Sequence, residues 1–171
     1  MNNIFTSHSS NFVSALSTET DPRTGQFMVN FPLASLTGNN NLGPELSLSL
    51  SYSPLFNGNT GFGTGFSLGI TRFSNLTNLL ELSSGEKYRG EPGTDTVRNQ
   101  KLNNFRFAYT NGNDDADGYT VFWKEGKQEQ LTLTGDNTFV TSQITSPLGR
   151  ILTLLWDWSG QQPLLVQIND E

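Results

Sequence analysis

The sequence predicts an all-β protein built from antiparallel strand-turn-strand hairpins that form a curved sheet or a sandwich. Three observations lead to this fold class. Apolar and polar residues alternate with a period of two wherever the sequence shows periodicity, which is typical of strands with one buried face. Turn-forming residues, including many of the 17 glycines, separate these segments at short intervals. No segment carries the long apolar stripe of period 3.6 that marks an amphipathic helix.

The clearest predicted strand is residues 45–53, where leucine and serine alternate so that one face is apolar and the other polar. Residues 76–82 also suit a strand, although their leucines are compatible with a helical turn. Residues 11–20 are the best candidate for a short helix. Their serines and threonines lower the helix propensity, so the sequence does not decide whether this helix forms. Further apolar faces of period two are Phe27/Val29/Phe31/Leu33, Phe66/Leu68/Ile70, Phe105/Phe107/Tyr109, Tyr119/Val121/Trp123 and Leu152/Leu154/Trp156/Trp158.

Three short turns predict three hairpins with a common plan. Residues 83–86, 124–127 and 146–149 each contain a glycine, and each lies between two apolar runs. Residues 164–168 resemble the first arm of another hairpin whose partner is missing, which suggests a segment truncated from a longer chain.

Length and turn chemistry together suggest a simple domain organisation. The length of 171 residues suits one domain with a sizeable core. We expect an N-terminal extension and turn over residues 1–25, with or without the short helix, followed by a β-hairpin segment over residues 26–171.

Composition excludes several classes of protein. With no cysteine and one histidine, the chain offers no disulfide scaffold, catalytic thiol, iron–sulfur cluster or structural zinc site, and we expect no cofactor. A formal charge of −6 argues against nucleic acid as a partner. The sequence has neither the pattern of a secretory signal nor the ~20 apolar residues of a membrane-spanning helix. We therefore expect synthesis in the cytoplasm and no membrane span, and any exit from the cell would use a specialised secretion system that does not read an N-terminal signal.

One acidic loop resembles the start of a calcium site. Asn113, Asp115 and Asp117 place oxygen donors at positions one, three and five of such a loop, and a glycine follows at position six. Position twelve, however, is Lys124, where calcium needs a bidentate glutamate. A solvated acidic turn is therefore favoured, and no metal site is expected.

Catalytic groups form no distinctive motif. His8 is the only imidazole base, and it lies in a polar N-terminal stretch. We therefore expect a protein that is not an enzyme. The carboxylates that could serve in glycoside hydrolysis stand in no characteristic pattern; they are Glu45, Glu81, Glu86, Glu129 and Asp157.

The three tryptophans leave open a second kind of function. Trp123, Trp156 and Trp158 could stack on sugar rings, as in a carbohydrate-binding β-sandwich. However, Trp156 and Trp158 share a strand face with Leu152 and Leu154, which favours a place in the core. Exposed coplanar rings would favour sugar binding, and buried rings would favour a structural role.

Several short sequence motifs occur in an order that is typical of one protein family. In the first half they are Asp21-Pro22-Arg23-Thr24-Gly25, Gly43-Pro44-Glu45-Leu46-Ser47-Leu48-Ser49-Leu50-Ser51-Tyr52 and Gly61-Phe62-Gly63-Thr64-Gly65-Phe66-Ser67-Leu68. In the second half they are Leu82-Ser83-Ser84-Gly85-Glu86-Lys87-Tyr88, Trp123-Lys124-Glu125-Gly126-Lys127 and Ile144-Thr145-Ser146-Pro147-Leu148-Gly149-Arg150-Ile151-Leu152-Thr153-Leu154. Together they resemble the opening of an RHS/YD-repeat protein, over roughly residues 11–168. The run 149–151 is similar to the Gly-Arg-Leu core of a YD repeat, although the preceding Tyr-Asp is absent.

The resemblance implies a structural role. Proteins of this family are long chains whose hairpins wind into a hollow β shell, and in bacterial members the shell encloses a C-terminal toxin. Residues 26–168 would build the first turns of that wall. The self-cleaving aspartates of the family lie near the far end of the shell, so no catalytic residue is carried over. The implied partners are the rest of the same chain, its toxin, and subunits of a secretion apparatus or toxin complex.

Overall fold

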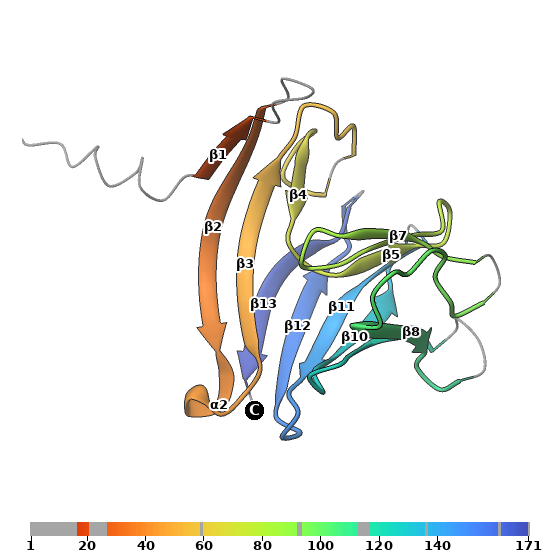
Figure 1. The fold of residues 1–171 in the computed structure, drawn as a ribbon. Helices are drawn as coiled ribbons and strands as arrows, with labels where there is room; N and C mark the ends of the chain where they lie inside the picture. Colours follow the sequence, from red (N-terminus) through yellow and green to blue (C-terminus); the bar gives the residue numbers. More distant parts are fainter. Residues whose placement is uncertain are drawn as a thin grey trace, which may run out of the picture.

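The described residues form an all-β fold of two antiparallel sheets, which confirms the predicted fold class (Figure 1). The structure is a computed structural model, and it describes residues 17–20, 27–58, 60–91, 94–112, 117–135, 137–160 and 162–170. Among these residues the only helix is the four-residue α2 (Gly38–Asn41), which connects two strands. No helix in these ranges is long and apolar enough to cross a membrane.

The first sheet has four strands in the order β1-β2-β3-β4. Their bounds are β1 (Ser17–Thr20), β2 (Phe27–Thr37), β3 (Glu45–Tyr52) and β4 (Phe66–Leu68). β1 takes up the last four residues of the segment for which a short helix was left open, and residues 11–16 lie outside the described residues.

The long strands β2 and β3 follow the predicted alternation except at one point. A bulge between Pro32 and Ala34 puts Leu33 out of register with β3. Leu33 is therefore exposed, and the predicted apolar face that it was to share with Phe31 is interrupted there. In β3, Leu46 and Leu48 pack on the second sheet, as the alternation requires.

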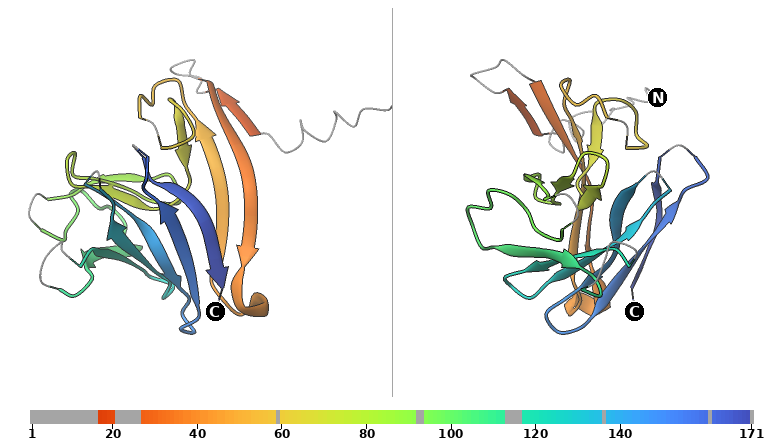
Figure 2. Two further views of the ribbon diagram at one scale, coloured as in Figure 1. Left: turned by 180° about the vertical axis from the view of Figure 1, so that it is seen from behind. Right: turned by 90° about the vertical axis from the view of Figure 1, so that its right-hand side faces the viewer.

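The second sheet has nine strands and is strongly curled (Figure 2). Seven of them follow the order β7-β6-β5-β11-β10-β9-β8, and the curl brings the rings of Tyr88 and Phe105, from the two end strands, to a centroid distance of 5.0 Å. The strand bounds are β5 (Arg72–Ser74), β6 (Leu79–Glu81), β7 (Lys87–Arg89), β8 (Phe105–Tyr109), β9 (Tyr119–Trp123), β10 (Gln128–Leu133), β11 (Thr138–Thr145), β12 (Ile151–Asp157) and β13 (Leu164–Asp170).

The second sheet forks at β11. One edge of β11 pairs with β10 along nearly its whole length. The other edge pairs first with β5, through Thr138–Val140, and then with β12, through Gln143–Thr145. The fork sends β5, β6 and β7 one way and β12 and β13 the other, so that the β12–β13 arm lies beside the first sheet (Figures 1 and 2).

The three predicted hairpins are confirmed, and they share one turn geometry. Their glycines have positive φ values of 88°, 93° and 80° at Gly85, Gly126 and Gly149. In each turn the glycine N–H donates to the carbonyl three residues earlier, at 2.8, 3.0 and 2.9 Å. This is the pattern of a type I turn closed by a left-handed glycine. The common plan seen in the sequence therefore holds at the level of the backbone.

Two apolar clusters fill the space around the fork. The larger lies inside the curl and consists of Phe73, Leu80, Leu82, Phe105, Phe107, Tyr119, Val121, Leu131 and Phe139. The smaller joins the first sheet to the β12–β13 arm and consists of Leu46, Ile70, Ile144, Leu152 and Leu154. β11 contributes to both clusters, through Phe139 and Ile144.

Candidate functional site

A buried carboxylate lies on β10 of the second sheet. Glu129 is only 3% exposed, and its Oε1 is 2.9 Å from the ammonium Nζ of Lys127. Thr71 donates its hydroxyl to the other carboxylate oxygen and in turn accepts the backbone N–H of Ser83 at 3.0 Å. The Lys127 ammonium also lies 4.7 Å from the centre of the Trp123 ring. Because both oxygens of Glu129 are engaged, the group clamps β10 to the β5–β7 region and is not a free base.

The sequence pattern contained a signal for this burial. Glu129 is two residues before Leu131, so both side chains lie on the same face of β10. Glu129 stands opposite Val121 on one neighbouring strand and Ile144 on the other, and both of these are buried. Applying the two-residue period to the charged residues, as well as to the apolar ones, would have placed Glu129 on the buried face of its strand.

A second carboxylate has an excess of cations around it. Glu81 forms ion pairs with the guanidinium of Arg72 and with the ammonium of Lys87, the latter at 2.6 Å. The ring of Phe56 covers both cations, at 5.6 Å from Arg72 and 5.2 Å from Lys87. Burial raises the pKa of Glu81, but Arg72 and Lys87 outweigh this effect, so that its pKa lies below the ordinary value of 4.5.

The lowered pKa of Glu81 predicts a loss of stability in acid. Between the ordinary pKa of 4.5 and the lower pKa in the fold, the unfolded chain binds a proton that the folded chain does not bind. We therefore expect the melting temperature to fall as the pH drops through this window, and Glu81→Gln to make that fall shallower. Thermal melts from about pH 6 to pH 3 measure this, with the exposed Glu45→Gln as the control. An unchanged pH profile in Glu81→Gln would contradict it.

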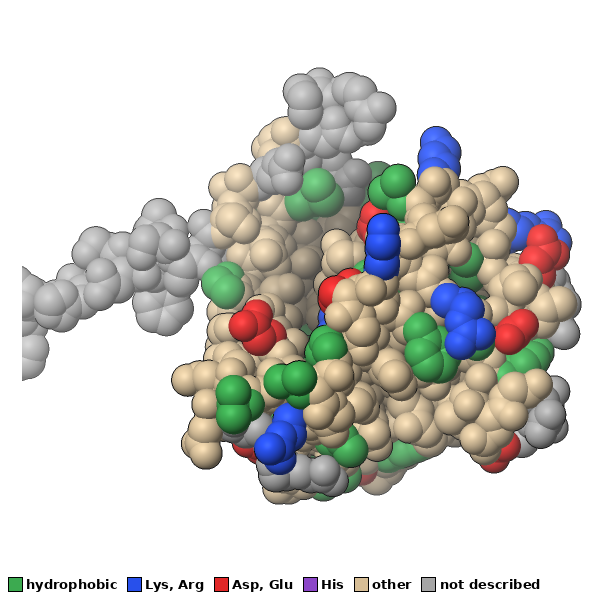
Figure 3. All heavy atoms as spheres, turned by 60° about the horizontal axis from the view of Figure 1, so that its bottom comes forward, with side chains coloured by type: hydrophobic (Ala, Val, Ile, Leu, Met, Phe, Trp, Pro, Cys, Tyr) green, Lys and Arg blue, Asp and Glu red, His purple; other side chains and the backbone are tan. Residues whose placement is uncertain are grey.

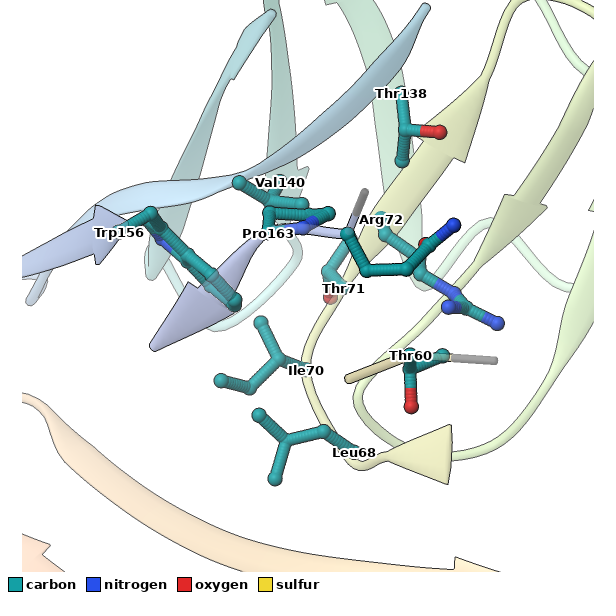
Figure 4. Close-up of a pocket in the computed structure, with 10 residues that line it drawn as sticks. Thr60, Leu68, Ile70, Thr71, Arg72, Thr138, Val140, Trp156 and Pro163 are labelled. Atoms are coloured by element: carbon teal, nitrogen blue, oxygen red, sulfur yellow. The ribbon is translucent and has the colours of Figure 1, made fainter. Parts of the chain in front are cut away.

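A small pocket lies at the fork of the second sheet (Figure 4). Its volume is about 60 Å³, and it is partly open to solvent. In Figure 4, Trp156, Ile70 and Leu68 lie toward one side of the pocket, and Arg72 and Thr60 lie at the other. The pocket thus has an apolar part and a cationic rim.

Two larger grooves are lined by both polar and apolar side chains. One, of about 570 Å³, lies between the serine face of β3, including Ser49 and Ser51, and the β6–β7 hairpin with Glu81 and Lys87. The other, of about 600 Å³, lies over the Glu129 cluster at the turns of the hairpins. The face shown in Figure 3 carries acidic, basic and hydrophobic side chains dispersed among other polar residues, so charge of neither sign gathers there.

The predicted tryptophan positions are only partly confirmed. Trp156 is half-buried, packs on the cluster formed with Leu152 and Leu154, and donates its indole N–H to the carbonyl of Thr141 at 2.8 Å. Trp158, by contrast, is 44% exposed, so its predicted place in the core is wrong. The reason is that β12 ends at Asp157, so the alternation of its two faces does not extend to Trp158.

Trp123 is half-buried in the curl, away from the other two tryptophans. Its ring lies 6.0 Å from that of Phe105, and its buried indole N–H has no hydrogen-bond partner in the part of the chain that the structure describes. The fold therefore does not bring the three predicted platforms together as one exposed row.

The acidic loop is described only in part. Asn113 and Asp115 lie outside the described residues, and Asp117 lies just before β9. Within the described ranges, no group of three or more histidine, aspartate or glutamate side chains is placed to hold a metal ion. The other carboxylates considered for catalysis, Glu45, Glu86 and Asp157, are exposed.

No family model matches the chain, and no curated protein matches it significantly.

Proposed function

We propose that the chain is a non-catalytic wall segment of an RHS-type β shell, which encloses a C-terminal toxin and is exported by a specialised system to deliver it. The partners would be the rest of the same long chain, its toxin, and subunits of a secretion apparatus or toxin complex. The observation that carries the proposal is the succession of three hairpins of one turn geometry within a curled antiparallel sheet that has an open edge. A wall that winds by adding hairpins needs this repetition and such an edge.

The open edge belongs to β13. In the described part of the chain this strand pairs only with β12, and most of its residues are exposed. Val166 is 62% exposed and Leu164 is 38% exposed. A seven-residue strand with apolar side chains at its free edge invites pairing with a further strand. In the proposed wall, the next hairpin would pair there.

Protease protection of the enclosed part tests the proposal on the natural polypeptide that carries this segment. We expect the C-terminal part to resist protease in the intact chain and to become sensitive in Val166→Lys, because the charge opposes pairing at the β13 edge. The matched control is Leu102→Lys, which changes an equally exposed leucine outside the strands. A C-terminal part that is equally sensitive in the unchanged chain would contradict the proposal.

A carbohydrate-binding module is the second candidate, and the exposure of Trp158 is the observation that favours it. In the wall segment, Trp156→Ala should lower the unfolding free energy by about 2–3 kcal/mol, because it removes packing and a hydrogen bond. Trp158→Ala should cost less than about 1 kcal/mol.

Glycan titrations on the same two variants separate the candidates. Maltotriose, cellotriose and chitotriose serve as probes for the unchanged chain, Trp156→Ala and Trp158→Ala. Saturable binding that disappears in Trp158→Ala, with an unchanged melting temperature, would support the sugar-binding module. Absence of binding to all three probes, with the large stability loss confined to Trp156→Ala, supports the structural role.

A further inference from the structure

We propose that the pocket at the fork of the second sheet binds a small carboxylate with a short branched apolar tail, using Arg72 to recognise the carboxylate. This site is independent of the wall function proposed above. It combines an apolar recess with a cation at its rim, which is the usual arrangement for holding a small amphiphilic ligand.

The apolar part of the pocket is formed where the fork leaves a gap between β5 and β12. Ile70 and Val140 are both buried, and Trp156 closes the side toward β12 (Figure 4). The Trp156 ring is held in place by its hydrogen bond to Thr141. The recess is therefore bounded by side chains that have little freedom to collapse into it.

The rim carries positive charge. Among the residues that line the pocket this charge belongs to Arg72, which shares the single carboxylate of Glu81 with Lys87, a residue outside the pocket lining. Arg72 binds Glu81 through Nε, and its two terminal nitrogens make no hydrogen bond within the described residues. Its side chain is 24% exposed, so these nitrogens lie in a partly desolvated position where they can take a carboxylate in the bidentate fashion typical of arginine.

The volume of the pocket limits the size of the apolar tail that the ligand can have. The pocket measures about 60 Å³, well under the ~150 Å³ of a dry cavity that holds benzene. A branched group of three or four carbons suits this recess, and an aromatic ring does not. The carboxylate would then lie toward Arg72 at the open side of the pocket.

Titration with 3-methylbutanoate tests the proposal, with 3-methylbutanamide as the uncharged analogue. Binding is followed by NMR through the methyl groups of Ile70 and Val140. We expect saturable shifts with a dissociation constant on the order of 1 mM, as suits a ligand of about seven heavy atoms. The amide should bind at least about tenfold more weakly, since it lacks the charge that Arg72 recognises.

Variants provide the second arm of the test. Arg72→Gln should weaken binding of the acid about tenfold, whereas Arg98→Gln, which breaks an exposed ion pair with Glu91, should leave it unchanged. If Arg72→Gln fails to fold, the comparison of acid and amide on the unchanged chain decides the question. Absence of saturable shifts up to about 50 mM acid, equal affinity for acid and amide, or full binding by a folded Arg72→Gln would overturn the proposal.

Discussion

Replacing Phe139 with alanine should cause one of the largest losses of stability of any single change in the chain, about 3–5 kcal/mol of unfolding free energy. Phe139 is fully buried at the centre of the larger cluster. Its ring meets that of Tyr119 edge-on at 4.8 Å and lies 6.1 Å from that of Phe73. The change would leave a cavity that these rings cannot fill, because they are themselves held on paired strands. The expected loss is a large share of the 5–15 kcal/mol of a typical domain.

Urea unfolding followed by fluorescence measures this loss, with Phe27→Ala as the matched control. Phe27 is 48% exposed, so the same chemical change should cost less than about 1 kcal/mol there. A Phe139→Ala variant as stable as Phe27→Ala would mean that the larger cluster is not the main core.

The second large effect is expected at Glu129. Replacing it with alanine leaves Lys127 without its carboxylate and the Thr71 hydroxyl without its acceptor. Breaking a buried ion pair from one side costs about 3–5 kcal/mol. We expect about 3 kcal/mol, the lower end, because the Lys127 side chain keeps a quarter of its surface exposed and is partly solvated.

A double variant distinguishes the loss of the Glu129–Lys127 attraction from the cost of leaving the Lys127 charge without a partner. Glu129→Met combined with Lys127→Met removes both charges and should recover most of the stability that Glu129→Ala loses. The neighbouring Glu125→Ala changes an exposed carboxylate in the same turn, and should alter the unfolding free energy by less than about 0.5 kcal/mol. If Glu129→Ala lowered the unfolding free energy as little as Glu125→Ala, the contacts of Glu129 with Lys127 and Thr71 would contribute nothing to stability.

Local alternation predicted much of the fold. Leu46 and Leu48 pack inward as the leucine-serine pattern requires, and the glycine turns close the expected hairpins. The failures occur where a bulge or the end of a strand interrupts the alternation. Leu33 is displaced by a bulge against β3, and Trp158 lies beyond Asp157, the last residue of β12. Neither effect is visible in the strand's own sequence.

The candidate sites were harder to predict, because they depend on pairing between distant segments. The pocket brings Ile70 and Trp156 together, and a hydrogen bond joins Thr71 to Glu129. Both depend on the fork of the second sheet, which no local sequence pattern specifies. Periodicity could place Glu129 on the inner face of its strand, but only the pairing of β11 with β5 brings Thr71 to it.

The fork at β11 affects which parts of the molecule can unfold locally. Both apolar clusters draw a residue from β11, so neither can lose its order without disturbing the strand on which the other depends. Such sharing turns two cores into a single cooperative unit, in which partial openings are confined to the outer strands. The backbone amides of β11 should accordingly exchange with solvent deuterium only when the whole fold unfolds, and those of β7 and β13 long before.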